Sequence, residues 1–390
     1  MRWLALASTL ACLLGGCGGD GGSGGDSVSP MANVMTVSVG ASSVCTSVNE
    51  LCAQVTICEP GTSSCQTISN ILIDIGSFGL RVFNSVLSLS LTQQVDSLGN
   101  PIGECTFFAD GSALWGPVQR AEVVLGGEPA VNVPIHVISP TFAAQSATAN
   151  PCLTVVESDP LLANFNGILG LGVFTEDCGP FCASNSNNGL YFSCVASTCT
   201  GTAVPVSNQV QNPVPFLPSD NNGVILALNA VPATGAQAVF GSLIFGIGTA
   251  ANNSPPAGVS VFTTNNNGFL TTMYKGTSFG QSVIDSGANG YFFPDATLPL
   301  CPMPVEDFYC PANPTNLSAT IIGTNSLQAM VSFQVANALT LALSGNNAFN
   351  NLGGQFSTFV WGLPFFFGRT VYVGIESQPS TLGTGPLIAF

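Results

Sequence analysis

Two matching stretches, ILIDIGS at Ile71–Ser77 and SVIDSGA at Ser282–Ala288, carry the strongest structural signal in the chain. Each is an apolar run that ends in Asp-x-Gly, at Asp74 and at Asp285. A carboxylate at the end of a buried strand must be compensated because it gives up its hydration, and a single case is usually a residue that caps a turn. Two cases with the same flanks favour a functional pair.

The repeat extends beyond these stretches. Each is followed, much later in the chain, by two apolar residues and a glycine, at Ile168–Gly170 and at Val360–Gly362. Two copies of the same order predict two related lobes, which we place at residues 31–230 and 231–390.

The residues beside the two aspartates suit acid–base chemistry. Gly76 and Gly287 permit a tight turn and a close backbone approach, and a hydroxyl such as that of Ser77 can hydrogen-bond a carboxylate. If the lobes face each other, Asp74 and Asp285 meet, and two carboxylates at that range cannot both ionise. One would then act as a base on a water molecule while the other, protonated, polarises a carbonyl group.

Beyond residue 30 the pattern is that of β-strands. Short apolar runs alternate with clusters of Gly, Pro and Asn, and no segment keeps a helical apolar period for more than about two turns. Strands are expected at Val34–Val39, Gln54–Cys58, Ile71–Ile73, Ala121–Leu125, Ala238–Phe245 and Thr370–Ile375. The chain is therefore predicted to be all-β, without long helices.

Taken together, these motifs resemble those of pepsin-like aspartic peptidases. Asp74–Ser77 and Asp285–Ala288 are similar to the paired D-T/S-G-S/T motifs of that family. The segment with Phe108 and Gly111 resembles the flap hairpin of that family, and the residues up to Gly127 resemble the strand after it. Four further segments also resemble the family: Gly167–Gly172, Ala238–Gly246, Val360–Phe365 and Thr370–Val373. The resemblance covers residues 32–390 and implies a two-lobed, all-β fold with a cleft between the lobes. The variant GSFGLR at Gly76–Arg81, in a Cys-rich chain, looks closer to an uncharacterised bacterial lipoprotein branch.

The chain departs from the family pattern at several positions. Ile75 stands where the family has a Thr that links the two active-site loops, and Ser286 keeps the other half of that link. Ala288 replaces a hydroxyl that bonds the second carboxylate, and Phe108 (or Phe107) stands where the flap carries Tyr. Each lost hydrogen bond would cost on the order of 1 kcal/mol in a site built for it.

The resemblance implies an aspartic endopeptidase that holds a peptide or protein in the cleft between the lobes. Asp74 and Asp285 would be catalytic and Gly76, Ser77, Ser286 and Gly287 supporting, with no metal or cofactor. The alternative is a non-catalytic binding or inhibitory protein of the same fold, because fold alone does not fix function. A structural or surface-interaction lipoprotein is a third reading.

The N-terminus predicts export and a lipid anchor. Arg2 precedes the apolar stretch Trp3–Leu14, which is too short to span a bilayer. The following LGGC resembles a bacterial lipobox, so residues 1–16 would be cleaved and Cys17 acylated; an ordinary signal peptide that contains a Cys is the alternative. Residues 17–30 would form a flexible, Gly-rich tether. Gly18 favours anchoring of the cell-envelope protein in the outer membrane, because inner-membrane retention typically uses Asp at that position.

The acidic net charge of the chain limits the kinds of molecule that it is expected to bind. Five Lys and Arg stand against twenty Asp and Glu, a net charge of −15, and only 6% of residues are charged. Phosphate binding needs Lys and Arg, so nucleic acid is not expected as a partner. The expected partners are a peptide or protein in the cleft and the membrane that holds the Cys17 lipid.

Fourteen cysteines indicate a disulfide framework. Without Cys12 and Cys17, twelve remain, enough for up to six bridges in an exported chain. Local pairs such as Cys58–Cys65, Cys194–Cys199 and Cys301–Cys310 are attractive, although the full connectivity stays open. Zinc is the rival explanation, but the chain has a single histidine.

Other motifs are weaker. GTSFG at Gly276–Gly280 matches a serine-hydrolase elbow, but that motif needs a helix after it and a histidine downstream. The only histidine, His136, lies upstream and is expected to be packed or on the surface. Arg81 is either a surface charge or the partner of an acid near the cleft.

Overall fold

The computed structural model describes residues 31–41, 47–144, 152, 157 and 159–390. The predicted signal peptide, Cys17 and the tether lie outside the described residues. No helix in the described part of the chain has the length and apolar character needed to cross a membrane.

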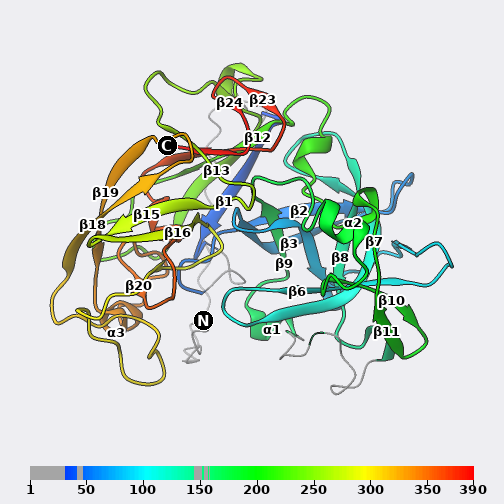
Figure 1. Ribbon diagram of the computed structural model, residues 1–390, viewed down its shortest axis with the longest axis horizontal. Coiled ribbons are helices and arrows are strands. Elements are labelled where there is room, and N and C mark those ends of the chain that lie inside the picture. The colour runs from blue at the N-terminus through cyan, green and yellow to red at the C-terminus, as the bar shows by residue number, and fades with distance from the viewer. Residues whose placement is uncertain (1–30, 42–46, 145–151, 153–156, 158) are drawn as a thin grey trace, which may run out of the picture.

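The chain is all-β, and the strands among its described residues form three sheets (Figure 1). Sixteen strands form the largest sheet: β1 Val34–Val39, β2 Cys52–Cys58, β3 Cys65–Asp74, β4 Phe78–Phe83, β5 Thr92–Gln93, β6 Ile102–Phe107, β7 Ala113–Val124, β8 Val131–Ile138, β9 Gly167–Leu171, β10 Tyr191–Val195, β11 Thr198–Gly201, β12 Gly223–Leu228, β13 Val239–Phe245, β14 Val261–Thr263, β22 Thr370–Gly374 and β25 Leu387–Ala389. Seven form the second: β15 Leu270–Tyr274, β16 Thr277–Ile284, β17 Tyr291–Phe292, β18 Thr315–Ile322, β19 Gln328–Val335, β20 Gly353–Gly354 and β21 Val360–Trp361. The third is the hairpin of β23 Pro379–Ser380 and β24 Gly383–Thr384.

The strands expected from the sequence are all present, and helices are few and short. The α-helices within the described residues are α1 Pro160–Ala163, α2 Pro180–Ser184 and α3 Ala338–Ala342. The GTSFG motif does not lead into a helix: Gly276 forms a turn with a φ of +82°, and the residues after it belong to strand β16. A strand in this place cannot supply the strand–turn–helix elbow of a serine hydrolase.

The same three-strand arrangement occurs twice, once around each Asp-x-Gly stretch. β3, which ends at Asp74, lies parallel to β9, and β9 pairs antiparallel with β4. Likewise β16, which ends one residue before Asp285, lies parallel to β21, and β21 pairs antiparallel with β17. The sequence repeat is therefore also a repeat of strand pairing.

Strands from distant parts of the chain meet in the middle of the largest sheet. β1 pairs antiparallel with β13 along its whole length, from Val34 opposite Ile244 to Val39 opposite Val239. β12 then joins β13 to β22. Figure 1 shows β1, β12 and β13 between the strands β2 and β3 on one side and β15, β16, β18 and β19 on the other. The proposed division near residue 230 stays a prediction, and it falls in the connection between β12 and β13.

Gly170, the last but one residue of β9, and Gly362, the residue after β21, lie in close contact with neighbouring backbone. A Cβ atom on Gly170 would lie 2.5 Å from the backbone nitrogen of Phe78. A Cβ atom on Gly362 would lie 2.1 Å from the carbonyl oxygen of Gly290 and 2.5 Å from that of Ala288. Only a residue without a Cβ permits these approaches.

Disulfides join neighbouring segments of the fold. The three local pairs expected from the sequence are bonded: Cys58–Cys65, Cys194–Cys199 and Cys301–Cys310. Two further bridges are present, Cys105–Cys152 and Cys178–Cys182. Cys52 is also disulfide-bonded, whereas Cys45 lies outside the described residues.

The contact at Gly362 generates a prediction about stability. Gly362→Ala should lower the free energy of unfolding by about 1–3 kcal/mol, because the added methyl group meets backbone atoms that cannot move independently. Gly280→Ala is the matched control, since a Cβ atom there meets nothing within 4 Å. Chemical denaturation of both variants tests this, and equal midpoints for the two would contradict it.

Candidate active site

Asp74 is the last residue of β3 and is held by the turn that follows it. Its side chain is 7% exposed. One carboxylate oxygen accepts a hydrogen bond from the backbone N–H of Gly76 at 2.7 Å, and the other accepts one from the Ser77 hydroxyl at 2.5 Å. The turn therefore fixes the orientation of the Asp74 carboxylate.

Asp285 occupies the equivalent place in the second copy. Its backbone N–H donates to the carbonyl of Trp361 at 2.9 Å, which continues the parallel pairing by one residue. Its carboxylate accepts a hydrogen bond from the Gly287 N–H at 2.8 Å. Ala288, at the position that matches Ser77, has no hydroxyl to donate, so only backbone N–H groups remain as donors from this turn.

The two aspartates are brought together, each against the glycine of the other copy. A Cβ atom on Gly76 would lie 2.5 Å from Cγ of Asp285, and one on Gly287 would lie 2.7 Å from Cγ of Asp74. The carboxyl groups also share a side-chain hydrogen bond. Both glycines are therefore required by the space that the opposite carboxyl group fills.

A single serine hydroxyl links the two Asp-x-Gly loops. Ser286 donates to the carbonyl of Ile73 at 2.7 Å and accepts from the N–H of Ile75 at 3.2 Å. The side chain of Ile75 is 4% exposed and belongs to the hydrophobic core. The link is thus made from one side only, as the sequence predicted.

The surroundings of Asp285 change the titration of its carboxyl group. Burial raises the pKa of Asp285 well above its ordinary value, and the charge of Asp74 and their shared hydrogen bond raise it further. A proton is therefore retained between the two side chains at pH values where an exposed carboxyl group would have lost it.

Both aspartates line a pocket of about 280 Å³. The pocket is closed on one side by the tip of the hairpin formed by β6 and β7. Phe108, at this tip, lines the pocket, whereas Phe107 does not line it and is 49% exposed. Gly111 makes the turn of the tip with a φ of +85° but is not among the lining residues. Of the two phenylalanines that the sequence left open, Phe108 is the one at the pocket.

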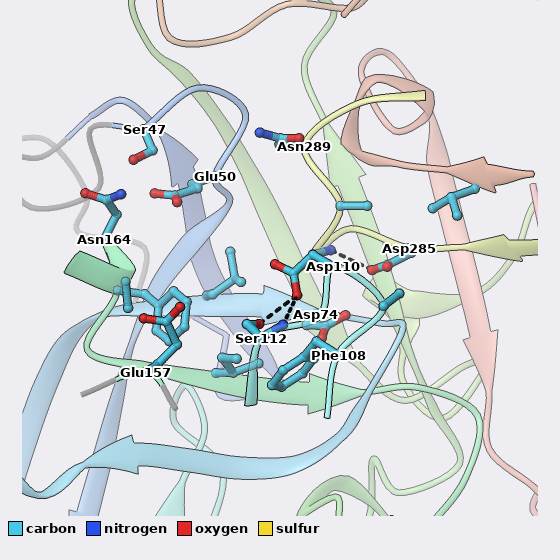
Figure 2. A pocket seen from close by; sticks show the side chains of 18 of the residues that line it. Ser47, Glu50, Asp74, Phe108, Asp110, Ser112, Glu157, Asn164, Asp285 and Asn289 are labelled. Carbon is cyan, nitrogen blue, oxygen red and sulfur yellow. Dashed lines mark hydrogen bonds between the residues drawn. The ribbon is translucent and has the colours of Figure 1, made fainter. Parts of the chain in front are cut away.

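Several lining residues were not singled out by the sequence. Figure 2 shows Asp110 and Ser112 of the hairpin tip near the aspartates, and Glu50, Glu157 and Asn164 further along the pocket. No motif marks these residues, because they come together from separate segments. Burial raises the pKa of Glu50 to about 8, although hydrogen bonds with Ser47 oppose the shift.

Arg81 and His136 are both buried in the first part of the chain, and neither lines the pocket. Arg81 is 1% exposed and forms ion pairs with Glu104 at 2.7 Å and Asp177 at 3.1 Å. His136 is fully buried, with Nδ1 at 3.6 Å from Glu104. Burial lowers the pKa of His136 to about 4. Of the two places that the sequence left open for His136, packed or on the surface, the structure has the packed one, and the partners of Arg81 are acids.

No cluster of three or more His, Cys, Asp or Glu side chains that could hold a metal ion occurs among the residues that the structure describes.

A family model described as "Protein of unknown function (DUF3443)" matches residues 29–390. No curated protein matches the chain.

The raised carboxyl pKa values predict that the folded protein is most stable in mild acid. Between about pH 4.5 and 8 the folded state keeps a proton on Glu50 that the unfolded chain releases, and the raised pKa of Asp285 acts in the same direction, so stability falls as the pH rises. The lowered pKa of His136 opposes part of this fall between about pH 4 and 6.5, because there the unfolded chain binds a proton that the buried imidazole does not. Toward pH 2 stability falls again: burial alone would raise the pKa of Glu104, but the charges of Arg81 and His136 lower it to about 2. The midpoint of chemical unfolding should therefore be highest near about pH 4–5.

Glu50→Gln separates this effect from general charge repulsion. It should flatten the decline between pH 5 and 8, whereas Glu306→Gln, which removes an exposed charge, should not. A midpoint that rises from pH 5 to 8 would contradict the prediction.

Proposed function

Because the chain belongs to the DUF3443 family of unknown function, we propose its activity from the site itself: peptide-bond hydrolysis by the aspartate pair Asp74 and Asp285. The observation that carries this proposal is the contact of each carboxyl group with the glycine of the opposite Asp-x-Gly loop. Two carboxyl groups that share a proton can supply a base and an acid in one site. The substrate would be a peptide or protein segment in the pocket beneath the hairpin tip.

We also propose the two-lobed fold of pepsin-like aspartic peptidases for residues 31–390, with lobes at 31–230 and 231–390. The repeated pairing of β3, β9 and β4 with that of β16, β21 and β17 supports it. In such a fold the proposed active site lies where the two copies face each other, and the hairpin of β6 and β7 is the flap.

The burial and the hydrogen bonds of the two carboxyl groups support one of them as the acid and the other as the base. Burial and the neighbouring charge favour a proton on Asp285, and both carboxylate oxygens of Asp74 accept hydrogen bonds, from the Gly76 N–H and the Ser77 hydroxyl. Asp74 would therefore take a proton from the attacking water, while Asp285 donates its proton to the oxygen of the scissile carbonyl. The resulting tetrahedral intermediate collapses when Asp74 gives the proton it took from water to the amide nitrogen, the C–N bond breaks, and Asp285 takes a proton back from a hydroxyl of the intermediate. The site needs no metal or cofactor for these steps.

A non-catalytic binding or inhibitory role is the second candidate, and specific residues favour it. Ile75 cannot supply the second hydroxyl link between the loops, and Ala288 cannot donate a hydroxyl hydrogen bond to Asp285. A pair held less firmly would retain a pocket for a peptide while losing rate, because catalysis depends on exact placement more strongly than binding does.

The location follows from the N-terminal residues. We propose that the chain is exported, that Cys17 carries lipid, and that residues 17–30 hold the folded part at the surface of the bacterial outer membrane. The Gly-rich composition of this segment, in which Val28 is the one aliphatic side chain, suits a tether.

Cleavage by the full chain should depend on both aspartates. We expect acid-favoured hydrolysis of a denatured protein substrate between pH 3 and 7, sensitive to pepstatin, and reduced by about 10²- to 10⁴-fold in Asp74→Asn and in Asp285→Asn. Asp307→Asn is the control, because Asp307 is exposed and does not line the pocket. No cleavage by folded, oxidised protein would reject a general peptidase and leave the binding role, which peptide-capture measurements on the same protein would then examine.

The anchor has its own test. In a bacterial host, the chain should incorporate labelled fatty acid and partition with outer-membrane material, and Cys17→Ser should abolish both. Cys12→Ser is the control, because Cys12 lies in the predicted signal peptide. Labelling that persists in Cys17→Ser would reject the proposed site of acylation.

A further inference from the structure

Arg81 holds a buried charge at the centre of a polar cluster that the proposed chemistry does not use. The cluster consists of Arg81 with five side chains that face it or one another: Glu104, Thr106, His136, Asp177 and Tyr191. The side chains of the cluster are buried; only Thr106 and the backbone of Asp177 keep some exposure to solvent. A buried polar cluster of this kind is costly to form and is retained only where its geometry is well satisfied.

The guanidinium group joins three separate segments. Its Nη1 donates to the carbonyl of Phe78 at 2.5 Å, immediately after the Ser77 that holds Asp74. Its Nη2 donates to Glu104 at 2.7 Å, and its Nε donates to Thr106 at 3.3 Å. Both of these residues belong to β6, one of the two strands of the hairpin that covers the pocket. The Asp74 loop and the hairpin therefore share one anchor.

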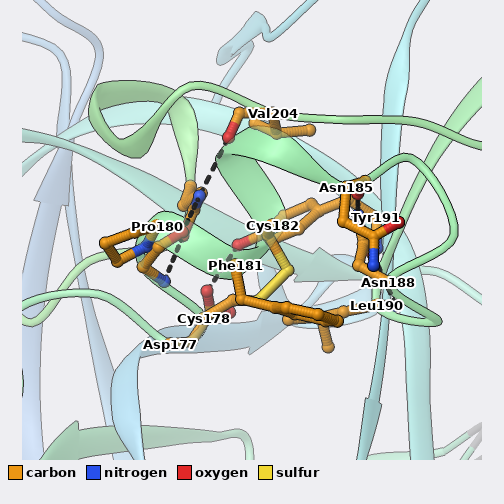
Figure 3. The surroundings of a disulfide bond; sticks show 12 residues. Asp177, Cys178, Pro180, Phe181, Cys182, Asn185, Asn188, Leu190, Tyr191 and Val204 are labelled. Atoms are coloured by element: carbon orange, nitrogen blue, oxygen red, sulfur yellow. Dashed lines mark hydrogen bonds between the residues drawn. A yellow bond between two sulfur atoms is a disulfide. The ribbon is translucent and has the colours of Figure 1, made fainter.

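The third segment follows β9 and supplies Asp177, which accepts from Nη2 at 3.1 Å. Figure 3 shows Asp177 beside the Cys178–Cys182 disulfide and near Tyr191. The Tyr191 hydroxyl donates to the other oxygen of Asp177 at 2.6 Å. Two residues earlier, the N–H of Thr175 donates to Glu376 at 3.0 Å, so the same segment also reaches the C-terminal part of the chain.

The geometry requires arginine and not merely a positive charge. Three nitrogens of one planar group donate in different directions, to a carbonyl, a hydroxyl and two carboxylates. A lysine ammonium group is a compact charge on a flexible stem and cannot span these acceptors together. Removing the charge altogether would leave Glu104 buried without compensation.

We propose that Arg81 is a positioning residue that fixes the Asp74 loop and the covering hairpin in one relative geometry. It acts through the carbonyl of Phe78 on one side and through Glu104 and Thr106 on the other, and it touches neither substrate nor the aspartate pair. This inference rests on the proposed function for its catalytic consequence. The structural claim, that Arg81 fixes the Asp74 loop relative to the covering hairpin and so affects the aspartate pair, rests only on the hydrogen bonds and ion pairs described above.

The test compares Arg81→Lys with Arg120→Lys in the full chain purified with its disulfides intact. Arg120 is the matched control because it lies in the same part of the chain, on β7, and donates to the carbonyl of Ser207 without contact to the cluster. Two quantities are measured: the titration of the two aspartates by carboxyl ¹³C NMR, assigned with Asp74→Asn and Asp285→Asn, and the pH profile of kcat and KM for cleavage.

We expect Arg81→Lys to shift the titration of the pair and to lower kcat on the order of 10²-fold with little change in KM, because misplacement affects the chemical step more than binding. Arg120→Lys should match the unchanged protein in both. A folded Arg81→Lys with the titration of the unchanged protein would overturn the proposal, since a purely structural residue would alter stability without moving the titration of a distant pair.

Asp177→Asn keeps the test decisive if Arg81→Lys does not fold. Burial and the charge of Glu104 raise the pKa of Asp177 well above its ordinary value, so the loss of its charge should be tolerated, although the amide nitrogen cannot accept a hydrogen bond as the oxygen that it replaces does. It removes one anchor of the guanidinium and should move the titration of the pair in the same direction, by less. If the unchanged protein does not cleave at all, the proposed function fails, and the NMR titration alone decides the role of Arg81.

Discussion

The hydroxyl of Ser286 makes the hydrogen bonds that tie the two Asp-x-Gly loops to each other. It donates to the carbonyl of Ile73 and accepts from the N–H of Ile75, so it satisfies two backbone groups that are buried at the junction. Because Ile75 offers no hydroxyl in return, this contact has no counterpart on the other side. The approach of Asp74 and Asp285, and the pocket around them, depend on loops that this one side chain holds in register.

Close approach also explains why small residues surround the pair. Gly76 and Gly287 leave space for the opposite carboxyl group. Gly170 and Gly362 allow their own backbone to pass close to the backbone that follows each aspartate. Each position is constrained by atoms that belong to a different part of the chain. The same crowding removes water from the carboxyl groups, which is why burial is the leading cause of the raised pKa of Asp285. The tight packing at this site and the raised pKa of Asp285 therefore have the same cause, which is the close approach of the two Asp-x-Gly loops.

A second layer supports this arrangement without lining the pocket. Arg81 connects the loop that carries Asp74 with the hairpin that covers the pocket, and Asp177 ties that connection to a disulfide-bonded segment. The cost of burying these charges is offset by several charge-assisted hydrogen bonds. Polar groups thus occur in two places in this part of the chain: the two aspartates at the pocket, and the buried ion pairs of Arg81 beneath it.

The sequence by itself determined the local structure: apolar runs broken by Gly, Pro and Asn specify strands, three short-range cysteine pairs specify disulfides, and the repeated Asp-x-Gly stretches single out Asp74 and Asp285. These features depend on residues close together in the chain, so their pattern can be read directly. Tertiary structure alone decided which of Phe107 and Phe108 faces the pocket, that Glu50 and Glu157 line it, and that Arg81 pairs with Glu104 and Asp177. These contacts join segments separated by tens to hundreds of residues, and no local pattern encodes a partner that only the packing of the strands brings near.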